Sequence, residues 1–153
     1  MQRLSRSIYI AKAHVSGGRS EGRGRSSDGV LDVDLRMPLE MGGTGGGTNP
    51  EQLFAVGYAA CFESALGAVA RRQRVEIGDV YIDAMVELRT GEDRSFEIAA
   101  GLDVTLVSVE TTKAIELVRQ AHSVCPYSNA IRGNVVVALT ANGAVVVTDG
   151  ANE

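Results

Sequence analysis

The sequence predicts a single α+β domain in which strand hairpins flank two helices. Its length of 153 residues suits one domain. Apolar and polar residues alternate along several short stretches, as in half-buried strands, and apolar residues recur at helical spacing along two longer ones. The resulting order of elements, β-β-α-β-β-α-β-β, favours antiparallel-rich sheets over a parallel doubly wound sheet. We therefore expect one domain over residues 1–153, with no internal repeat.

Two strands separated by loops are expected in the N-terminal third. Residues 7–15 alternate well enough to form a strand, which Gly17-Gly18 would end. Residues 19–29 are polar and rich in glycine, so they are expected to form a loop. Residues 30–35 alternate cleanly and predict the second strand. Residues 37–47 hold one proline and five glycines and predict a connector.

A long helix is predicted from a cap at Thr48 or Asn49 to about Arg72. Pro50 suits the first turn of a helix, where its missing N–H costs no hydrogen bond. Residues 55–70 are apolar on nearly every face and include small residues that let other backbones approach closely. A helix of this kind is typical of the centre of a core or of a subunit interface.

Two further hairpins and a second helix are predicted in the C-terminal half. The second helix stops where a proline breaks the pattern. The last hairpin contains Asn-Gly, the strongest two-residue turn signal in the chain. The predicted elements are strands at 80–90 and 96–107 around a turn at 91–94, a helix at 110–124 ending before Pro126, a short turn at 128–132, and strands at 135–139 and 144–147 around Asn142-Gly143.

The charge and composition exclude several classes of partner. A net charge of −4 and a pI near 5.2 argue against binding to nucleic acid or to an anionic membrane. Aromatic residues make up 5% of the chain and Trp is absent, so base-stacking platforms are not expected. No secretory signal follows the basic first residues, and no run approaches the roughly 18 apolar residues that span a bilayer. We expect a cytoplasmic protein.

The two cysteines carry the chemistry that the sequence suggests. Cys61 lies in the middle of the predicted long helix, and Cys125 stands where the second helix breaks at Pro126. In the cytoplasm a disulfide between them would more often be catalytic or sensory than structural. A catalytic thiol needs a nearby cation, hydrogen-bond donor or helix N-terminus, and nothing cationic lies within one turn of Cys61. A small apolar residue in a helix core remains an alternative reading of Cys61.

Several stretches of the sequence resemble a known family. Thr48-Asn49-Pro50-Glu51-Gln52-Leu53-Phe54-Ala55, continuing to Cys61-Phe62, and Val124-Cys125-Pro126-Tyr127-Ser128-Asn129-Ala130 closely resemble the organic hydroperoxide resistance (Ohr) branch of the Ohr/OsmC family. Residues 17–19 and 26–33 support this resemblance. It implies an Ohr/OsmC-like fold with antiparallel-rich sheets around a central buried helix, assembled as an intertwined homodimer.

The resemblance also implies roles for four residues. Cys61 matches the peroxidatic cysteine and Cys125 the resolving one, while Arg19 matches the arginine that holds the thiolate and Glu51 the carboxylate that orients this arginine. Glu51 and Cys61 are ten residues apart on one predicted helix, or roughly 15 Å along its axis. Either Arg19 bridges part of this distance, or Arg19 and Glu51 serve the Cys61 of a partner subunit; we favour the second hypothesis.

Four aromatic residues near the cysteines are candidates for an apolar pocket that binds an alkyl tail. They are Phe54, Tyr58, Phe62 and Tyr127, and plain core packing is the alternative for each.

The activity that the resemblance implies is reduction of organic hydroperoxides to alcohols by a thiol-dependent peroxidase. A Cys61 sulfenic acid would condense with Cys125, and dihydrolipoamide or a lipoylated protein would reduce the disulfide. No cofactor or metal is expected, because His14 and His122 match no metal-binding spacing. The alternatives are an OsmC-type peroxidase, a non-enzymatic thiol redox sensor, and a structural dimer with inert cysteines.

Overall fold

The computed structural model describes residues 5–149, and the side chains of residues 5–146. The chain divides into two compact units, residues 1–50 and residues 51–153. The expectation of one domain over the whole chain stays a prediction.

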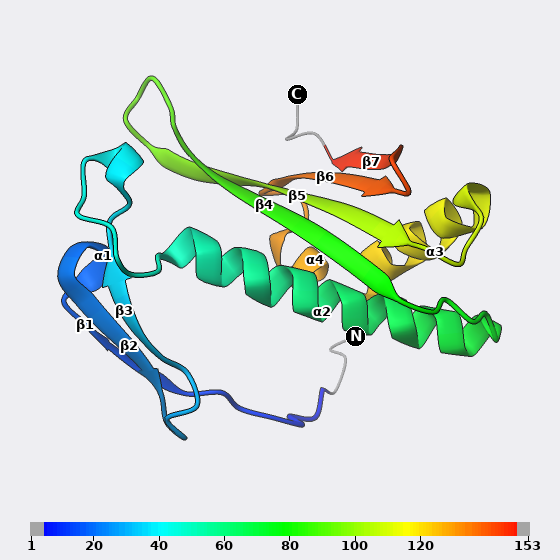
Figure 1. Ribbon diagram of the computed structural model, residues 1–153, viewed down its shortest axis with the longest axis horizontal. Helices are drawn as coiled ribbons and strands as arrows, with labels where there is room; N and C mark the ends of the chain where they lie inside the picture. Colours follow the sequence, from blue (N-terminus) through cyan, green and yellow to red (C-terminus); the bar gives the residue numbers. More distant parts are fainter. Residues whose placement is uncertain (1–4, 150–153) are drawn as a thin grey trace. The chain divides into compact units, whose positions relative to one another are not determined.

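The first unit contains a three-stranded antiparallel sheet in the order β1-β2-β3 (Figure 1). Two expected strands have different bounds in the structure. The strand expected at residues 7–15 starts six residues later, and the strand expected at residues 30–35 starts two residues later and ends one residue later. The elements are β1 (Ala13–Ser16), a helical turn α1 (Gly18–Glu21), β2 (Gly22–Ser26), β3 (Asp32–Arg36) and a 3-10 turn η1 (Leu39–Met41).

Strand β2 was not predicted, because its alternation is one of glycine and arginine instead of apolar and polar residues. Gly22 and Gly24 are buried, while Arg23 and Arg25 are exposed. A Cβ atom on Gly24 would meet side chains of the two neighbouring strands at 3.7–4.0 Å, so the neighbours already cover this face. Arg23 donates two hydrogen bonds to the carboxylate of Asp32, at 2.8 and 2.9 Å, across the exposed face. The expectation of a loop over residues 19–29 is therefore wrong.

The second unit combines three helices with a four-stranded sheet in the order β4-β5-β6-β7. The outer pairs β4–β5 and β6–β7 are antiparallel, and β5–β6 is parallel, so the chain crosses between β5 and β6 through two helices. The elements are α2 (Pro50–Gln73), β4 (Val80–Thr90), β5 (Phe96–Leu106), α3 (Thr111–Val124), α4 (Pro126–Ile131), β6 (Val136–Ala141) and β7 (Ala144–Asp149).

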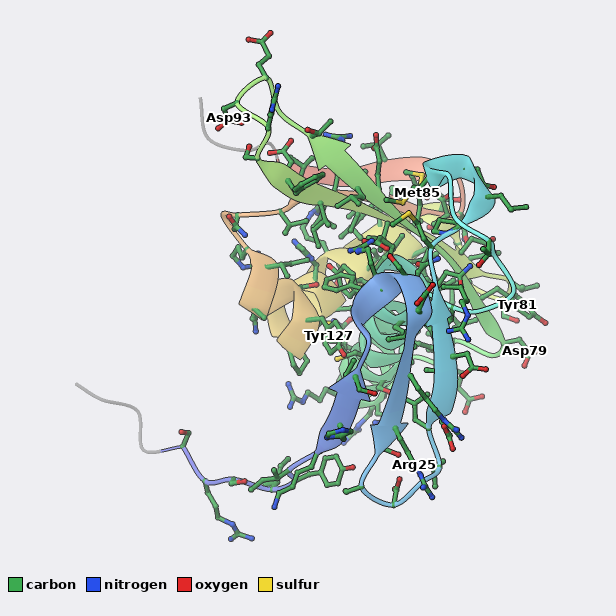
Figure 2. All side chains as sticks on the ribbon, turned by 90° about the vertical axis from the view of Figure 1, so that its left-hand side faces the viewer. Arg25, Asp79, Tyr81, Met85, Asp93 and Tyr127 are labelled. Atoms are coloured by element: carbon green, nitrogen blue, oxygen red, sulfur yellow. The ribbon has the colours of Figure 1, made fainter. Side chains whose placement is uncertain are left out.

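The helices of the second unit pack against one face of its sheet (Figure 1). Strand β5 turns Leu102, Val104 and Leu106 into the core, with Asp103 and Thr105 exposed between them. The α3 residues Ala114, Leu117, Val118 and Ala121 are fully buried in the same core cluster. On the other face of the sheet, β4 exposes Tyr81 and Met85 (Figure 2).

Helix α2 is apolar on more faces than the second unit covers. Tyr58, Phe62 and Leu66 are fully buried in the core, whereas Val56 is 72% exposed. An 18-residue window of α2 has a mean hydropathy of 1.6, and 28% of that window is buried. By length and composition alone α2 meets the requirement for crossing a membrane, which corrects the expectation that no segment approaches it. The core helix of a soluble protein meets the same requirement, so length and composition do not decide between these roles.

The turn at Asn142-Gly143 fixes the end of the sheet, as its sequence predicts. Both residues have positive φ, 49° and 80°, which the tight hairpin turn requires. The Asn142 side chain accepts the Leu106 N–H at 2.8 Å and donates to the carbonyls of Leu106 and Val109 at 3.2 and 2.9 Å. The turn thus holds the β6–β7 hairpin against the end of β5.

Candidate active site

The two cysteines meet although 64 residues separate them in the chain. The Sγ atoms of Cys61, on α2, and Cys125, between α3 and α4, lie 3.8 Å apart, and both thiols are free. A disulfide has an S–S length of about 2.05 Å, so a small approach of the two sulfurs would join them. Cys125 is fully buried, and Cys61 is partly exposed. The pair is therefore suited to reversible disulfide formation, with Cys61 as the thiol that a solute can reach.

The joint between α3 and α4 holds Cys125 in place. Cys125 closes α3 and opens α4, with an extended backbone (φ −64°, ψ 125°) of the kind favoured before a proline. Its N–H donates to the Ala121 carbonyl at 2.8 Å, and its own carbonyl accepts the Asn129 N–H at 3.0 Å. The expected short turn after Pro126 is thus a helix that begins at Pro126 itself, two residues earlier than predicted.

The surroundings of Cys61 within the second unit favour its neutral form. Burial is the largest cause that raises the pKa of the Cys61 thiol above its ordinary value, and the neighbouring Cys125 raises it further. The backbone N–H of Tyr127, in the first turn of α4, hydrogen-bonds the Cys61 sulfur and acts in the opposite direction. Because the thiolate is the reactive form, a peroxidase would need an additional source of positive charge at this site.

Aromatic rings cluster beside the thiol pair. The Tyr127 ring stacks on Tyr58 with centroids 6.0 Å apart, and Phe54 meets both rings edge-on at 5.9 and 6.0 Å. Tyr58 and Phe62 are fully buried core residues, whereas Tyr127 is 39% exposed and extends from α4 (Figure 2). Packing explains the burial of Tyr58 and Phe62. A pocket-lining role of the four aromatic residues stays a prediction.

The proposed partners of Cys61 lie in two different units. Arg19 lies in α1 of the first unit, and Glu51 lies in the first turn of α2. Helix α2 runs without interruption from Pro50 to Gln73, so the separation of roughly 15 Å along the axis between Glu51 and Cys61 holds. The contact between Arg19 and Cys61 stays a prediction.

A chain of three buried polar side chains lies next to the thiols. The Ser128 Oγ atom lies 2.8 Å from the Tyr58 hydroxyl oxygen and 2.9 Å from His122 Nδ1. From the sequence, Tyr58 was predicted to line a pocket and His122 matched no metal-binding spacing, and no pattern connected the two residues. One available signal was His122 itself, a polar residue on the apolar face of α3.

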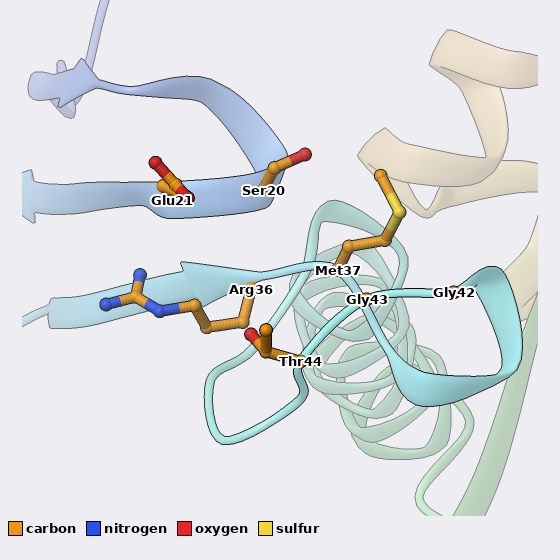
Figure 3. Close-up of a pocket in the computed structure, with 7 residues that line it drawn as sticks. All are labelled: Ser20, Glu21, Arg36, Met37, Gly42, Gly43 and Thr44. Atoms are coloured by element: carbon orange, nitrogen blue, oxygen red, sulfur yellow. The ribbon is translucent and has the colours of Figure 1, made fainter.

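The first unit has a surface groove of about 510 Å³ beside the glycine-rich connector (Figure 3). Its lining residues are Ser20, Glu21, Arg36, Met37, Gly42, Gly43 and Thr44. A Cβ atom on Gly43 would collide with the Met37 carbonyl, so glycine is required there by packing. The Arg36 guanidinium donates to the backbone carbonyls of Gly22 and Leu35 at 3.0 and 2.7 Å. The groove is thus shaped by backbone packing, with the Arg36 guanidinium bound to backbone carbonyls of its own unit.

Within the part of the chain that the structure describes, no group of three or more His, Cys, Asp or Glu side chains is placed to hold a metal ion.

The family model described as OsmC-like protein matches residues 43–140, which include both cysteines. The chain belongs to the OsmC-like family.

Relatives within the OsmC-like family identify the branch. The organic hydroperoxide resistance protein of Xanthomonas axonopodis pv. citri is 48% identical over 136 residues, 87% of this chain and 94% of the relative. OhrB of Bacillus subtilis, also called an organic hydroperoxide resistance protein, is 49% identical over 133 residues, 86% of this chain and 96% of the relative. The chain is a member of the organic hydroperoxide resistance branch, as its cysteine motifs predict.

Solved structures of the OsmC-like family confirm the predicted fold class. An organic hydroperoxide resistance protein from Legionella pneumophila matches with a TM-score of 0.85 and 46% identity, over 89% of this chain and 98% of that one. Bacillus subtilis OhrB matches with a TM-score of 0.80 and 48% identity, over 88% and 99%. The α+β, Ohr/OsmC-like architecture with antiparallel-rich sheets is therefore confirmed.

Proposed function

We propose that this member of the OsmC-like family is a thiol-dependent peroxidase that reduces organic hydroperoxides to alcohols. The names of its close relatives support a role in organic hydroperoxide resistance. The observation that carries the chemistry is the 3.8 Å separation of the Cys61 and Cys125 sulfurs, one partly exposed and the other fully buried. The exposure difference supports Cys61 as the thiol that meets the hydroperoxide and Cys125 as the thiol that resolves the product.

The proposed reaction has two chemical steps on the enzyme. The Cys61 thiolate attacks the terminal oxygen of ROOH, the O–O bond breaks, and the alkoxide takes a proton and leaves as ROH, so that Cys61 becomes a sulfenic acid. Cys125 then attacks the Cys61 sulfur, the S–S bond forms, and hydroxide leaves as water with the proton of the Cys125 thiol. The hydroperoxide is reduced by two electrons, which the two thiols supply.

Arg19 is proposed to keep Cys61 anionic. Burial raises the pKa of Cys61, and a guanidinium beside the sulfur would oppose this shift and could also hydrogen-bond the peroxide. Glu51 is proposed to fix the Arg19 side chain through a charge-assisted pair. The axial distance between Glu51 and Cys61 favours a site to which Arg19 and Glu51 come from a partner subunit.

A homodimer is proposed as the functional assembly. The uncovered apolar face of α2, where Val56 is exposed, supports burial against a second copy. Heterodimers that carry Glu51→Ala on one chain and Cys61→Ser on the other test the shared site. A site built from two chains predicts one intact site per dimer, whereas a site within one chain predicts none.

The reductant is proposed to be a dihydrolipoyl group, free or protein-bound. It would open the Cys61–Cys125 disulfide through two successive thiol–disulfide exchanges and leave as the oxidised lipoyl disulfide. The reaction needs no metal, flavin or haem. The aromatic residues beside the thiols, Phe54 and Tyr127 above all, are proposed to accept the alkyl tail of the substrate. A cytoplasmic location stays a prediction.

Steady-state turnover tests the proposal against a non-enzymatic thiol sensor. With dihydrolipoamide present, a peroxidase consumes many equivalents of cumene hydroperoxide per chain, whereas a sensor consumes about one equivalent and stops. Consumption limited to one equivalent, with both thiols intact at the start, would reject the peroxidase. Faster turnover of hydrogen peroxide than of bulky hydroperoxides would contradict organic hydroperoxides as the substrate class.

A further inference from the structure

The hydrogen bonds that join Tyr58, Ser128 and His122 have no part in the reaction as described above, although the three residues lie within one helical turn of Cys61 or Cys125. Tyr58 and Ser128 are completely buried and His122 is 5% exposed. Burying three polar side chains is costly unless they satisfy one another, and no described buried side-chain nitrogen or oxygen lacks a hydrogen-bond partner. Ser128 is the shared member, because its hydroxyl can donate to one neighbour and accept from the other.

The positions of the three residues relate them to the thiols in a regular way. Tyr58 stands three residues before Cys61 on α2, and His122 stands three residues before Cys125 on α3. Ser128 stands three residues after Cys125, on α4. Ser128, on α4, is therefore hydrogen-bonded to α2 through Tyr58 and to α3 through His122, and these are the three helices that meet at the thiol pair.

A second set of hydrogen bonds, made by Arg132, also joins α3 to α4. The Arg132 guanidinium donates to the His122 carbonyl at 2.9 Å and to the Asn129 side-chain oxygen at 3.0 Å. It links the last turn of α3 to α4, whereas the Ser128 hydroxyl links both helices to α2. Of these two contacts, the one made by Ser128 reaches the helix that carries Cys61.

We propose that Ser128, held by Tyr58 and His122, is a positioning residue that keeps Cys125 within reach of Cys61. The proposal rests on the proposed disulfide chemistry of the two cysteines. Forming the disulfide requires the sulfurs to approach from 3.8 Å to about 2.05 Å while α4 stays docked on α2. Holding the first turn of α4 in advance removes the conformational freedom that bond formation would otherwise have to restrict. The same contact keeps the Tyr127 N–H directed at the Cys61 sulfur.

The test measures how readily the thiols pair, without any hydroperoxide. The full-length protein is equilibrated with dithiothreitol buffers, in which oxidised dithiothreitol accepts two electrons and two protons as the Cys61–Cys125 bond forms. The equilibrium constant gives the effective concentration of Cys125 at Cys61. Ser128→Ala removes two buried hydrogen bonds and should lower the effective concentration about tenfold. Tyr58→Phe keeps the ring and the His122–Ser128 contact, loses one hydrogen bond, and should lower the effective concentration about threefold.

A matched control separates positioning from general stability. Gln73→Ala breaks a polar cluster between α2 and α3, in which Gln73 donates to Gln120 at 2.6 Å. Gln73 lies twelve residues beyond Cys61, roughly 18 Å along α2. The control should lower the melting temperature and leave the effective concentration at the wild-type value.

The measured effective concentrations decide whether Ser128 is a positioning residue or a packing residue. A wild-type effective concentration in both Ser128→Ala and Tyr58→Phe, with lower melting temperatures, would show Ser128 to be a packing residue and overturn the proposal. If Ser128→Ala does not fold, Tyr58→Phe alone decides in the same way. Failure of hydroperoxide turnover alone would reject the peroxidase and leave this result standing. Absence of a Cys61–Cys125 disulfide in the wild-type protein would overturn the proposal.

Discussion

The sulfur of Cys61 lies 3.8 Å from the sulfur of Cys125, and the two differ in their access to solvent. In the proposed reaction a hydroperoxide would meet Cys61 first, because Cys125 is fully buried in the core cluster. The sulfenic acid formed at Cys61 would then have a thiol already in contact with it. Proximity of this kind replaces an encounter between two molecules by a step within one molecule.

The two cysteine-to-serine variants are expected to differ in how much hydroperoxide they consume. Cys61→Ser should consume no hydroperoxide, since the attacking sulfur is gone. Cys125→Ser should consume about one equivalent and then stall, or recover only slowly, because its sulfenic acid has no resolving thiol. Stopped-flow consumption of cumene hydroperoxide and mass spectrometry of the trapped sulfenic acid measure both effects. Full multiple turnover by Cys125→Ser would remove Cys125 from the mechanism.

Removal of Arg19 is expected to raise the pKa of the Cys61 thiol. Burial already raises this pKa, and a guanidinium that stabilises the thiolate would lower it. The thiolate is the form that is alkylated, so the midpoint of the alkylation rate against pH should shift to higher pH in Arg19→Ala. Iodoacetamide alkylation of Cys61 in the Cys125→Ser background measures the midpoint.

The matched control for this experiment is Arg25→Ala. Arg25 is an exposed arginine of the same unit, its side chain 64% accessible, and its loss should leave the midpoint unchanged. If Arg19→Ala and Arg25→Ala gave the same midpoint, Arg19 would not be the source of the charge.

The elements that were predicted well are those whose local sequence pattern agrees with their place in the fold. Strand β4 has the predicted bounds, since alternate residues of 80–90 face the core and solvent in turn. The end of α3 follows from Pro126, which cannot continue a helix, and the last hairpin follows from Asn142-Gly143. For α3 and the last hairpin, one or two residues impose the local backbone geometry, and for β4 the alternation of the whole segment does so.

Features that depend on distant contacts were not predicted. In strand β2, Gly24 fits under side chains of β1 and β3, and Gly22 lies against backbone carbonyls of Ser16 and Gly18, which no local pattern records. The parallel pairing of β5 with β6 depends on how α3 and α4 cross the sheet. The link from Ser128 to Tyr58 joins residues 70 positions apart, and it is visible only once α2 and α4 are packed. The cysteine pair was predicted through the family resemblance.

Replacement of Asn142 by alanine is expected to destabilise the protein by about 2–4 kcal/mol. The change removes three hydrogen bonds to Leu106 and Val109, worth about 1 kcal/mol each, and places alanine at a positive φ. Asn142→Gly is the control, because glycine tolerates the φ of 49° while losing the same bonds. Urea unfolding should place Asn142→Gly between the wild-type protein and Asn142→Ala. Equal stability of all three would contradict the role of this turn.

Gly57 and Tyr127 are expected to be energetically coupled across α2 and α4. A Cβ atom on Gly57 would lie 2.9 Å from the Tyr127 hydroxyl oxygen and 3.5 Å from its ring. Alanine in a helix is favoured over glycine by about 1 kcal/mol, but here this gain is opposed by displacement of the Tyr127 side chain. Gly57→Ala alone should therefore change the free energy of unfolding little. In the Tyr127→Phe background, which lacks the hydroxyl, the same change should stabilise the protein by about 1 kcal/mol. Denaturant unfolding of the two single variants and the double variant gives the coupling energy, and additive effects would show that the ring moves aside freely.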